Sequence, residues 1–217
     1  MSLKDKEFET LINSDYTTAE QLVYFREKLV DKIKELSRKE SKTDLILIIV
    51  FSLYFLINVN AIDDISLGPI QIIDTKLVLI FIPIIFSLTL LRLIILYNYK
   101  RVQINSLSQV LQKIKPFGHS ESELRILIPF DITSFTNVID YSKGKFWGVL
   151  LLILYIPVMI GLVLLLYGIQ FYWLFELIPN WNQNWLFKAS IIFTGWVIFF
   201  QLCFFMLIVL NNLDEND

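Results

Sequence analysis

The residues of this sequence that could do chemistry are few, and most of them lie in or beside long apolar stretches. Arg92 is the one charge that we place inside such a stretch, between Leu77 and Tyr99. Burying a charge in a bilayer costs about 3 kcal/mol even on lenient scales, so such a residue indicates a function by default. Two interpretations stay open. Arg92 could extend past Tyr97 to lipid phosphate, or it could belong to a water-filled or anion-conducting path.

A line of polar residues runs along the last apolar stretch. An unsatisfied polar group in hydrocarbon is costly, so this line needs a partner helix or water. It could pack inside one subunit, or it could be shared between subunits and line or close a pore. On a helix that turns about 100° per residue, its four members fall within about 40° of one another: Ser190, Thr194, Gln201 and Asn212.

Three residues that favour close packing or bending share a face of the third apolar stretch: Pro157, Gly161 and Gly168. Small residues let helices approach closely, and a proline with nearby glycines is where a spanning helix can bend. We predict a helix-packing face here, with a hinge as the alternative.

Basic residues gather at the ends of the predicted spans on one side. They could simply hold the chain's orientation, or they could bind an anionic ligand such as a nucleotide, an oligonucleotide or a lipid headgroup. The group comprises Arg92, Lys100, Arg101, Lys143 and Lys145.

The sequence offers no convergent catalytic set. It has one histidine, His119, one cysteine, Cys203, no glycine loop for phosphate and no paired acids within a span. An enzyme needs a nucleophile, a base or metal ligands that converge. We therefore predict that the chain is not an enzyme and that it binds no cofactor and no metal.

The elements that position these residues are predicted to be membrane-spanning helices. Thirty residues from Phe146 to Phe175 carry no charge. At about 1.5 Å per residue they would extend about 45 Å as a helix, against a hydrocarbon core of about 30 Å, so the helix must tilt or kink, and Pro157 offers a kink. Three further apolar stretches predict an all-α membrane protein with four transmembrane helices at 45–62, 77–99, 146–175 and 186–210.

The N-terminal segment, 1–44, is predicted to contain an amphipathic helix from a capping box at Thr17 and Glu20 to about Ser41. One narrow apolar stripe runs along it. The stripe could pack on the rest of the cytosolic region, associate with other copies or a partner, or lie on the membrane surface. Its members are spaced three and four apart: Leu22, Phe25, Leu29, Ile33 and Leu36.

The segment 100–145 is the one long connection. It should open with an amphipathic continuation of the second span that stops at Pro116 and Gly118. A second capping box, Ser120 with Glu123, predicts a short helix that Pro129 ends, and a further short helix is predicted around Phe135, Val138 and Ile139.

Charge predicts the topology. The first 44 residues hold nine lysines and arginines and residues 99–145 hold seven, whereas the connections 63–76 and 176–185 hold only Lys76. Lysine and arginine are retained on the cytoplasmic side. We therefore predict that the N-terminus, the helical loop 100–145 and the tail 211–217 are cytoplasmic, and that 63–76 and 176–185 are outer loops.

In span count, topology and its charged N-terminal helix at 17–41, the chain resembles the small four-span membrane subunits of bacterial anti-phage defence systems, such as the membrane component of Kiwa-type or Hailong-type systems. The resemblance implies an oligomeric effector that perturbs the inner membrane when a cytoplasmic partner or ligand signals infection.

Two functions are compatible with these features. One is a homo-oligomeric, channel-like or membrane-perturbing subunit of the bacterial inner membrane, with three or four copies in contact with lipid and controlled from its cytoplasmic side. The other is a non-conducting membrane anchor or inhibitor that docks a soluble or membrane partner. A pore needs the face of Ser190, Thr194 and Gln201 to be wet, whereas an anchor needs it dry.

Overall fold

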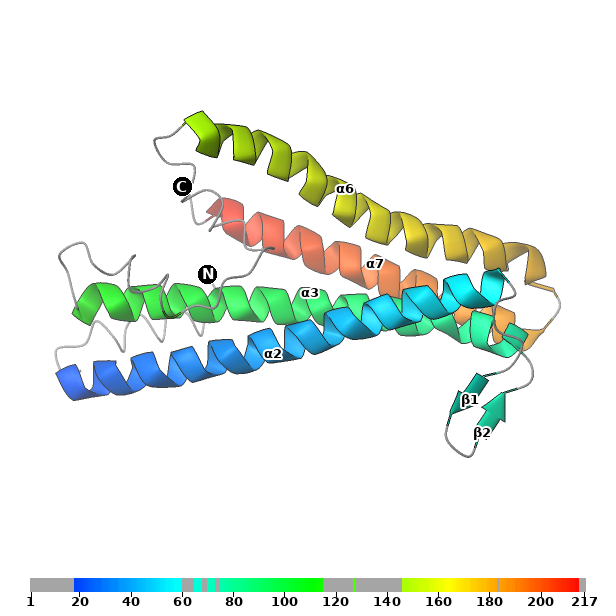
Figure 1. Ribbon diagram of the computed structural model, residues 1–217, viewed down its shortest axis with the longest axis horizontal. Coiled ribbons are helices and arrows are strands. Elements are labelled where there is room, and N and C mark those ends of the chain that lie inside the picture. Colours follow the sequence, from blue (N-terminus) through cyan, green and yellow to red (C-terminus); the bar gives the residue numbers. More distant parts are fainter. Residues whose placement is uncertain are drawn as a thin grey trace.

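The protein is an elongated bundle of long helices (Figure 1). The computed structural model describes residues 18–59, 65–67, 70–72, 75–114, 127, 146–182 and 184–214. Within these residues the long helices are α2 (Ala19–Asn58), α3 (Thr75–Ile114), α6 (Phe146–Leu177) and α7 (Trp185–Asp214). The prediction of a helical protein is confirmed.

Helix α2 begins one residue later than the sequence predicted. Its N-cap is Thr18, whose hydroxyl accepts from the Gln21 amide at 3.3 Å, while the Gln21 side chain accepts from the Thr18 amide at 3.0 Å. The capping box at Thr17 and Glu20 is therefore wrong by one residue. Glutamine closes the box as well as glutamate does, because only its side-chain oxygen is needed.

Helix α2 also continues past Ser41, where we expected it to end. Its 40 residues run unbroken into the apolar stretch. No glycine or proline lies between Ser41 and Leu45 to stop a helix. The Ser41 and Thr43 hydroxyls bond back to the carbonyls of Ser37 and Lys39, one turn earlier, so these residues fit inside the helix.

Helix α3 also has 40 residues, and it contains Pro83. The predicted continuation beyond Tyr99 is confirmed, and the helix ends at Ile114, two residues before Pro116. A residue that precedes proline is disfavoured in the helical conformation, which accounts for the end. The capping box at Ser120 and the short helices predicted between 120 and 139 lie outside the described residues.

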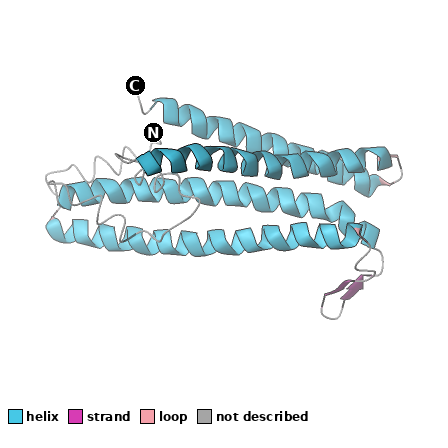
Figure 2. Cartoon of the chain, turned by 45° about the horizontal axis from the view of Figure 1, so that its top comes forward, coloured by secondary structure: helices cyan, strands magenta, loops and turns pink. Residues whose placement is uncertain are grey.

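Helices α2 and α3 pack side by side along their lengths (Figures 1 and 2). The buried positions of α2 from residue 33 on alternate three and four apart, which is the pattern of a coiled-coil seam. They are Ile33, Leu36, Glu40, Thr43, Leu47, Val50, Tyr54 and Ile57. A single seam therefore joins the charged half of α2 to its apolar half.

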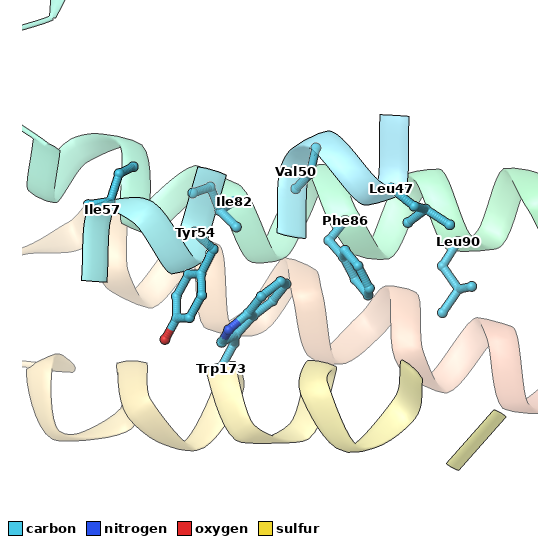
Figure 3. Packing of buried hydrophobic residues seen from close by; sticks show 8 residues of the cluster. All are labelled: Leu47, Val50, Tyr54, Ile57, Ile82, Phe86, Leu90 and Trp173. Atoms are coloured by element: carbon cyan, nitrogen blue, oxygen red, sulfur yellow. The ribbon is translucent and has the colours of Figure 1, made fainter. Parts of the chain in front are cut away.

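Two apolar clusters lie along this seam. In the first, Val30 and Ile33 of α2 pack with Leu107 and Leu111 of α3. The second is larger and includes the Trp173 ring of α6, which stands between Tyr54 and Phe86 (Figure 3). Its members are Leu47, Val50, Tyr54, Ile57, Ile82, Phe86, Leu90 and Trp173. Each cluster includes side chains of both α2 and α3.

An ion pair interrupts the apolar seam between the two clusters. The Lys100 Nζ lies 2.6 Å from the Glu40 Oε2, and the two side chains are only 7% and 11% exposed. A buried charge is tolerated only when it is paired, because removing an ion from water costs several kcal/mol. Each residue is therefore needed by the other.

The remaining elements connect at one end of the bundle. Helix α6 contains Pro157 and is followed by a 3-10 turn, η1 (Ile178–Asn180), which leads towards α7. At the same end, the short strands β1 (Ile65–Leu67) and β2 (Ile70–Ile72) form an antiparallel pair (Figure 2), which we did not predict. Gly68 and Pro69, between the two strands in the sequence, lie outside the described residues.

Three helical segments of the described chain are long and apolar enough to cross a membrane: Val78–Ile114, Val163–Asn180 and Trp185–Leu207. The chain thus has the helices that a multi-pass membrane protein requires. The apolar part of α2, Leu45–Asn58, would extend only about 21 Å, which is shorter than a hydrocarbon core of about 30 Å.

We predict that the Glu40–Lys100 pair matters for stability only as a pair. Glu40→Leu should lower the free energy of unfolding by about 3 kcal/mol, because it removes the carboxylate that lies 2.6 Å from a buried ammonium. Glu40→Leu combined with Lys100→Met should restore at least the original stability. The measurement is loss of helical circular dichroism in mixed micelles titrated with a denaturing detergent.

Glu35 provides the control, because its ion pairs with Lys39 and Lys32 lie on the surface of the same helix. These lysines, Lys39 first, lower the pKa of Glu35 from 4.5 to about 2. These exposed ion pairs contribute little to the free energy of unfolding. That small contribution is complete above pH 4.5 and is lost as the pH falls towards 2. Glu35→Gln should not measurably change stability at pH 7. If the double variant Glu40→Leu/Lys100→Met were as unstable as Glu40→Leu alone, the prediction for the Glu40–Lys100 pair would be contradicted.

Candidate functional site

The polar line of α7 faces α3 of the same chain. The Ser190 hydroxyl donates to the Ile80 carbonyl and the Gln201 amide nitrogen donates to the Ser87 carbonyl, both at 2.7 Å. Thr194, which lies between them on α7, is fully buried. The line is therefore an internal contact between two helices. Asn212 lies in the last turns of α7, and its side chain is outside the described part.

One of these bonds reaches α3 close to its proline. Pro83 lacks an amide hydrogen, so the helix around it cannot complete its usual ladder of hydrogen bonds. Side chains of neighbouring helices commonly satisfy such freed backbone groups in apolar surroundings. Proline at position 83 frees the carbonyl of Leu79, and the Ser190 hydroxyl bonds to the next carbonyl, that of Ile80.

Several other polar atoms lie buried in the bundle without a hydrogen-bond partner among the described residues. They are the hydroxyl oxygens of Ser37, Ser87, Thr194 and Tyr167, the Oε1 of Gln201, and both amide atoms of Gln170. Gln170 is a residue of α6 that the sequence reasoning missed, and it is fully buried. Unpaired polar groups weaken a bundle, so this interior is less optimised than an apolar one.

The face of Pro157, Gly161 and Gly168 is exposed on α6. A methyl group added at either glycine would meet no atom within 4 Å. Neither glycine therefore permits a close approach between helices of this chain. Among the side chains of α6 that the structure describes, Trp173 and Leu177 are buried together with Gln170.

The basic residues that we grouped do not converge on α3. Lys100 is buried against Glu40, whereas Arg92 and Arg101 are exposed. Nine residues separate these two arginines, which places them about 180° apart around the helix. Among the described residues, the basic group therefore does not form one site. Lys143 and Lys145 lie outside the described residues.

The N-terminal stripe lies along the face of α2 that meets α3. Ile33 and Leu36 are buried, Ile33 against Leu107 and Leu111, and Leu29 packs at the edge of the same cluster. Leu22 and Phe25, nearer the start of α2, are half-buried. Of the three alternatives for the stripe, the structure shows packing within the chain for Leu29 and Ile33.

Sequence reasoning also missed a polar contact between α2 and α6. The Tyr54 hydroxyl donates to the Glu176 carboxylate at the end of the bundle where η1 lies. The available signal was the spacing, since Tyr54 follows Glu40 and Leu47 at intervals of seven on the seam. Continuing the N-terminal stripe through residue 57 would have marked both Glu40 and Tyr54 as inward-facing.

Comparisons with protein-family models, with curated proteins and with solved structures gave no match. The functional argument therefore depends on the residues and the geometry described above. The described residues also contain no group of three histidine, cysteine or acidic side chains that could hold a metal ion.

We predict that Thr194 is inaccessible to water. On a Cys203→Ser background, Thr194→Cys should resist a charged, water-soluble thiol reagent in the purified protein, because the position is fully buried. Asn182→Cys, at an exposed turn, is the matched control and should react quickly. Mass spectrometry of the intact chain measures both reactions. Equal labelling at the two positions would show that the polar face is wet.

Proposed function

We propose that this chain is a multi-pass membrane protein of the bacterial inner membrane that anchors a rigid helical hairpin in the cytoplasm. The hairpin is the antiparallel pair formed by the charged parts of α2 and α3 (residues 19–44 and 100–114), which lie at the opposite ends of these helices from their connection. It docks a soluble partner. The unbroken seam between α2 and α3 is the observation that carries the proposal, because it connects the apolar and charged halves without a flexible joint.

The length of the hairpin supports a docking role. The 26 residues of α2 before Leu45 would extend about 39 Å beyond the apolar stretch. Val30 and Ile33 pack against α3, while charges of both signs, together with Val23 and Tyr24, are exposed. A mixed-charge helical surface suits recognition of a protein better than attachment to an anionic membrane.

The proposed topology has four spans with both termini inside. It follows from the concentration of lysine and arginine in residues 1–44 and 100–145. The hydrogen bonds from α7 to α3 are consistent with it, because they run in the same order along both helices: Ser190 to Ile80, and Gln201 to Ser87. Both helices would then cross the membrane in the same direction.

The polar line supports an anchor over a pore lined by α7. Ser190, Thr194 and Gln201 are at most 1% exposed within a single chain, so they are not available to a water-filled path between subunits. The faces of α7 that are exposed carry large apolar side chains, including Phe193, Trp196 and Phe199. Such faces suit contact with lipid or with another apolar helix.

A homo-oligomeric, channel-like effector remains the second candidate. The observation in its favour is the set of unpartnered polar atoms in the bundle, above all both amide atoms of Gln170. A rearrangement that brought these groups to a common path would give them water as a partner. The resemblance in layout to the membrane subunits of anti-phage systems also favours this candidate.

Site-specific photo-crosslinking tests the docking role. With a photoreactive amino acid at Lys34, an exposed position on the outer face of the hairpin, the expected result in growing cells is a crosslink to one soluble protein. The same substitution at Leu164, exposed on α6, should crosslink only lipid or membrane protein. Crosslinks from Lys34 to copies of this chain alone would contradict docking.

Membrane potential separates the two candidates. For an anchor, expression of the full chain should leave the potential of the inner membrane at the value of an empty-vector control, with or without Gln201→Leu. For a channel-like effector, expression should depolarise the cells. If expression depolarised the cells and Gln201→Leu abolished the effect, the anchor proposal would be overturned. The Gln201 side chain bonds to α3, so it could line a conducting path only if α7 moved.

A further inference from the structure

A cavity opens between the helices at the end of the bundle that carries η1. Its volume is about 310 Å³, at the lower end of the range for small-ligand pockets, which is about 300–1,000 Å³. Residues of all four long helices contribute to its wall. The cavity is separate from the cytoplasmic hairpin, so the inference below does not depend on the docking role.

Three aromatic rings from three helices line this cavity: Tyr54 of α2, Trp173 of α6 and Phe187 of α7. The Tyr54 and Trp173 rings have centroids 4.5 Å apart, and Trp173 is only 2% exposed. The Phe86 ring meets Trp173 edge-on at 4.9 Å and helps to fix it. Figure 3 shows Tyr54 and Trp173 side by side, with the tyrosine hydroxyl directed towards α6.

The cavity also contains one negative charge. Glu176 contributes to the wall, and its carboxylate accepts a hydrogen bond from the Tyr54 hydroxyl. Among the residues that the structure describes, no lysine or arginine pairs with this carboxylate. Lys188, the residue after Phe187, lies instead over the Trp181 ring, 5.7 Å from its centroid. The hydrogen bond orients the carboxylate but leaves its charge uncompensated.

Backbone chemistry adds a further acceptor. Leu79 and Pro83 both line the cavity. Because Pro83 has no amide hydrogen, it cannot donate to the carbonyl of Leu79, four residues earlier. The Leu79 carbonyl, in the part of α3 that borders the cavity, therefore lacks its usual helical donor.

We propose that this cavity binds an ammonium group. Aromatic rings attract cations through their negative π-faces, and the Glu176 carboxylate, on an exposed residue at the same site, supplies the counter-charge. An inorganic divalent cation fits poorly, because calcium and magnesium require about six oxygen ligands and the cavity offers few. The ligand is either a small soluble amine or the headgroup of an amino-phospholipid.

Calorimetric titration of the full chain in detergent micelles tests this proposal. The probe is choline, and the control is 3,3-dimethylbutan-1-ol, which has the same shape without the charge. We expect choline to bind at least about tenfold more tightly than the neutral alcohol, a ratio that corresponds to a cation–π contribution of the usual size. Equal affinity for the two compounds, or no binding of choline, would overturn the proposal.

Two variants locate the site. Glu176→Gln keeps the size of the side chain and an acceptor for Tyr54 but removes the charge, and it should weaken choline binding about tenfold. Glu35→Gln, on the exposed face of α2, is the matched control and should bind like the original chain. Both variants should keep the original helical circular dichroism. Unchanged binding by a folded Glu176→Gln protein would also overturn the proposal.

Nanodiscs distinguish the two sources of the ammonium group. In discs made of phosphatidylethanolamine, a lipid headgroup that occupied the cavity would compete with choline and weaken its apparent affinity relative to discs of an uncharged glycosyl diacylglycerol, which has neither an ammonium group nor a net charge that attracts choline. Equal choline affinity in both lipids would assign the site to a soluble amine. Either result supports an ammonium site, provided that choline binds and that Glu176→Gln weakens the binding.

Discussion

The seam between α2 and α3 is the constraint on which the rest of the structure depends. Each of these helices has 40 residues and would extend about 60 Å. Isolated helices gain little stability by themselves, so most of it must come from the packing of one face against a neighbour. The seam supplies that face along the charged and apolar halves alike. Helix α6 then joins it at Trp173, and α7 joins it through hydrogen bonds to the α3 backbone.

Polar groups in this bundle are used inside the chain more than the composition indicates. The charges of Glu40 and Lys100 neutralise each other between the two apolar clusters. Ser190 and Gln201 bond to backbone carbonyls of α3, the helix that contains Pro83. Fixed partners of this kind specify which helices are neighbours. In contrast, the exposed surfaces of α6 and α7 are mostly apolar. They require an apolar environment but do not determine which molecule provides it.

The sequence was sufficient for α3, α6 and α7, but not for the full length of α2 or for which helices are neighbours. Apolar runs and prolines gave the extents of α3, α6 and α7 within a few residues. The seam of α2 was recognised only as far as Leu36, because Glu40 and Thr43 are polar and such residues usually face water. Lys100 was placed among the surface bases because its partner is 60 positions away. Periodicity showed that Ser190, Thr194 and Gln201 share a face, but it cannot show which helix that face meets.

The buried ion pair has a mechanical consequence. If α2 slid along α3 by one heptad, about 10 Å, the apolar seam residues would find equivalent apolar neighbours, but Glu40 and Lys100 would each face a side chain without opposite charge. The pair thus favours one register of the two helices and opposes a piston motion. A load on the tip of the hairpin would instead reach the membrane as a tilt or a twist of both helices together, in the manner of a lever.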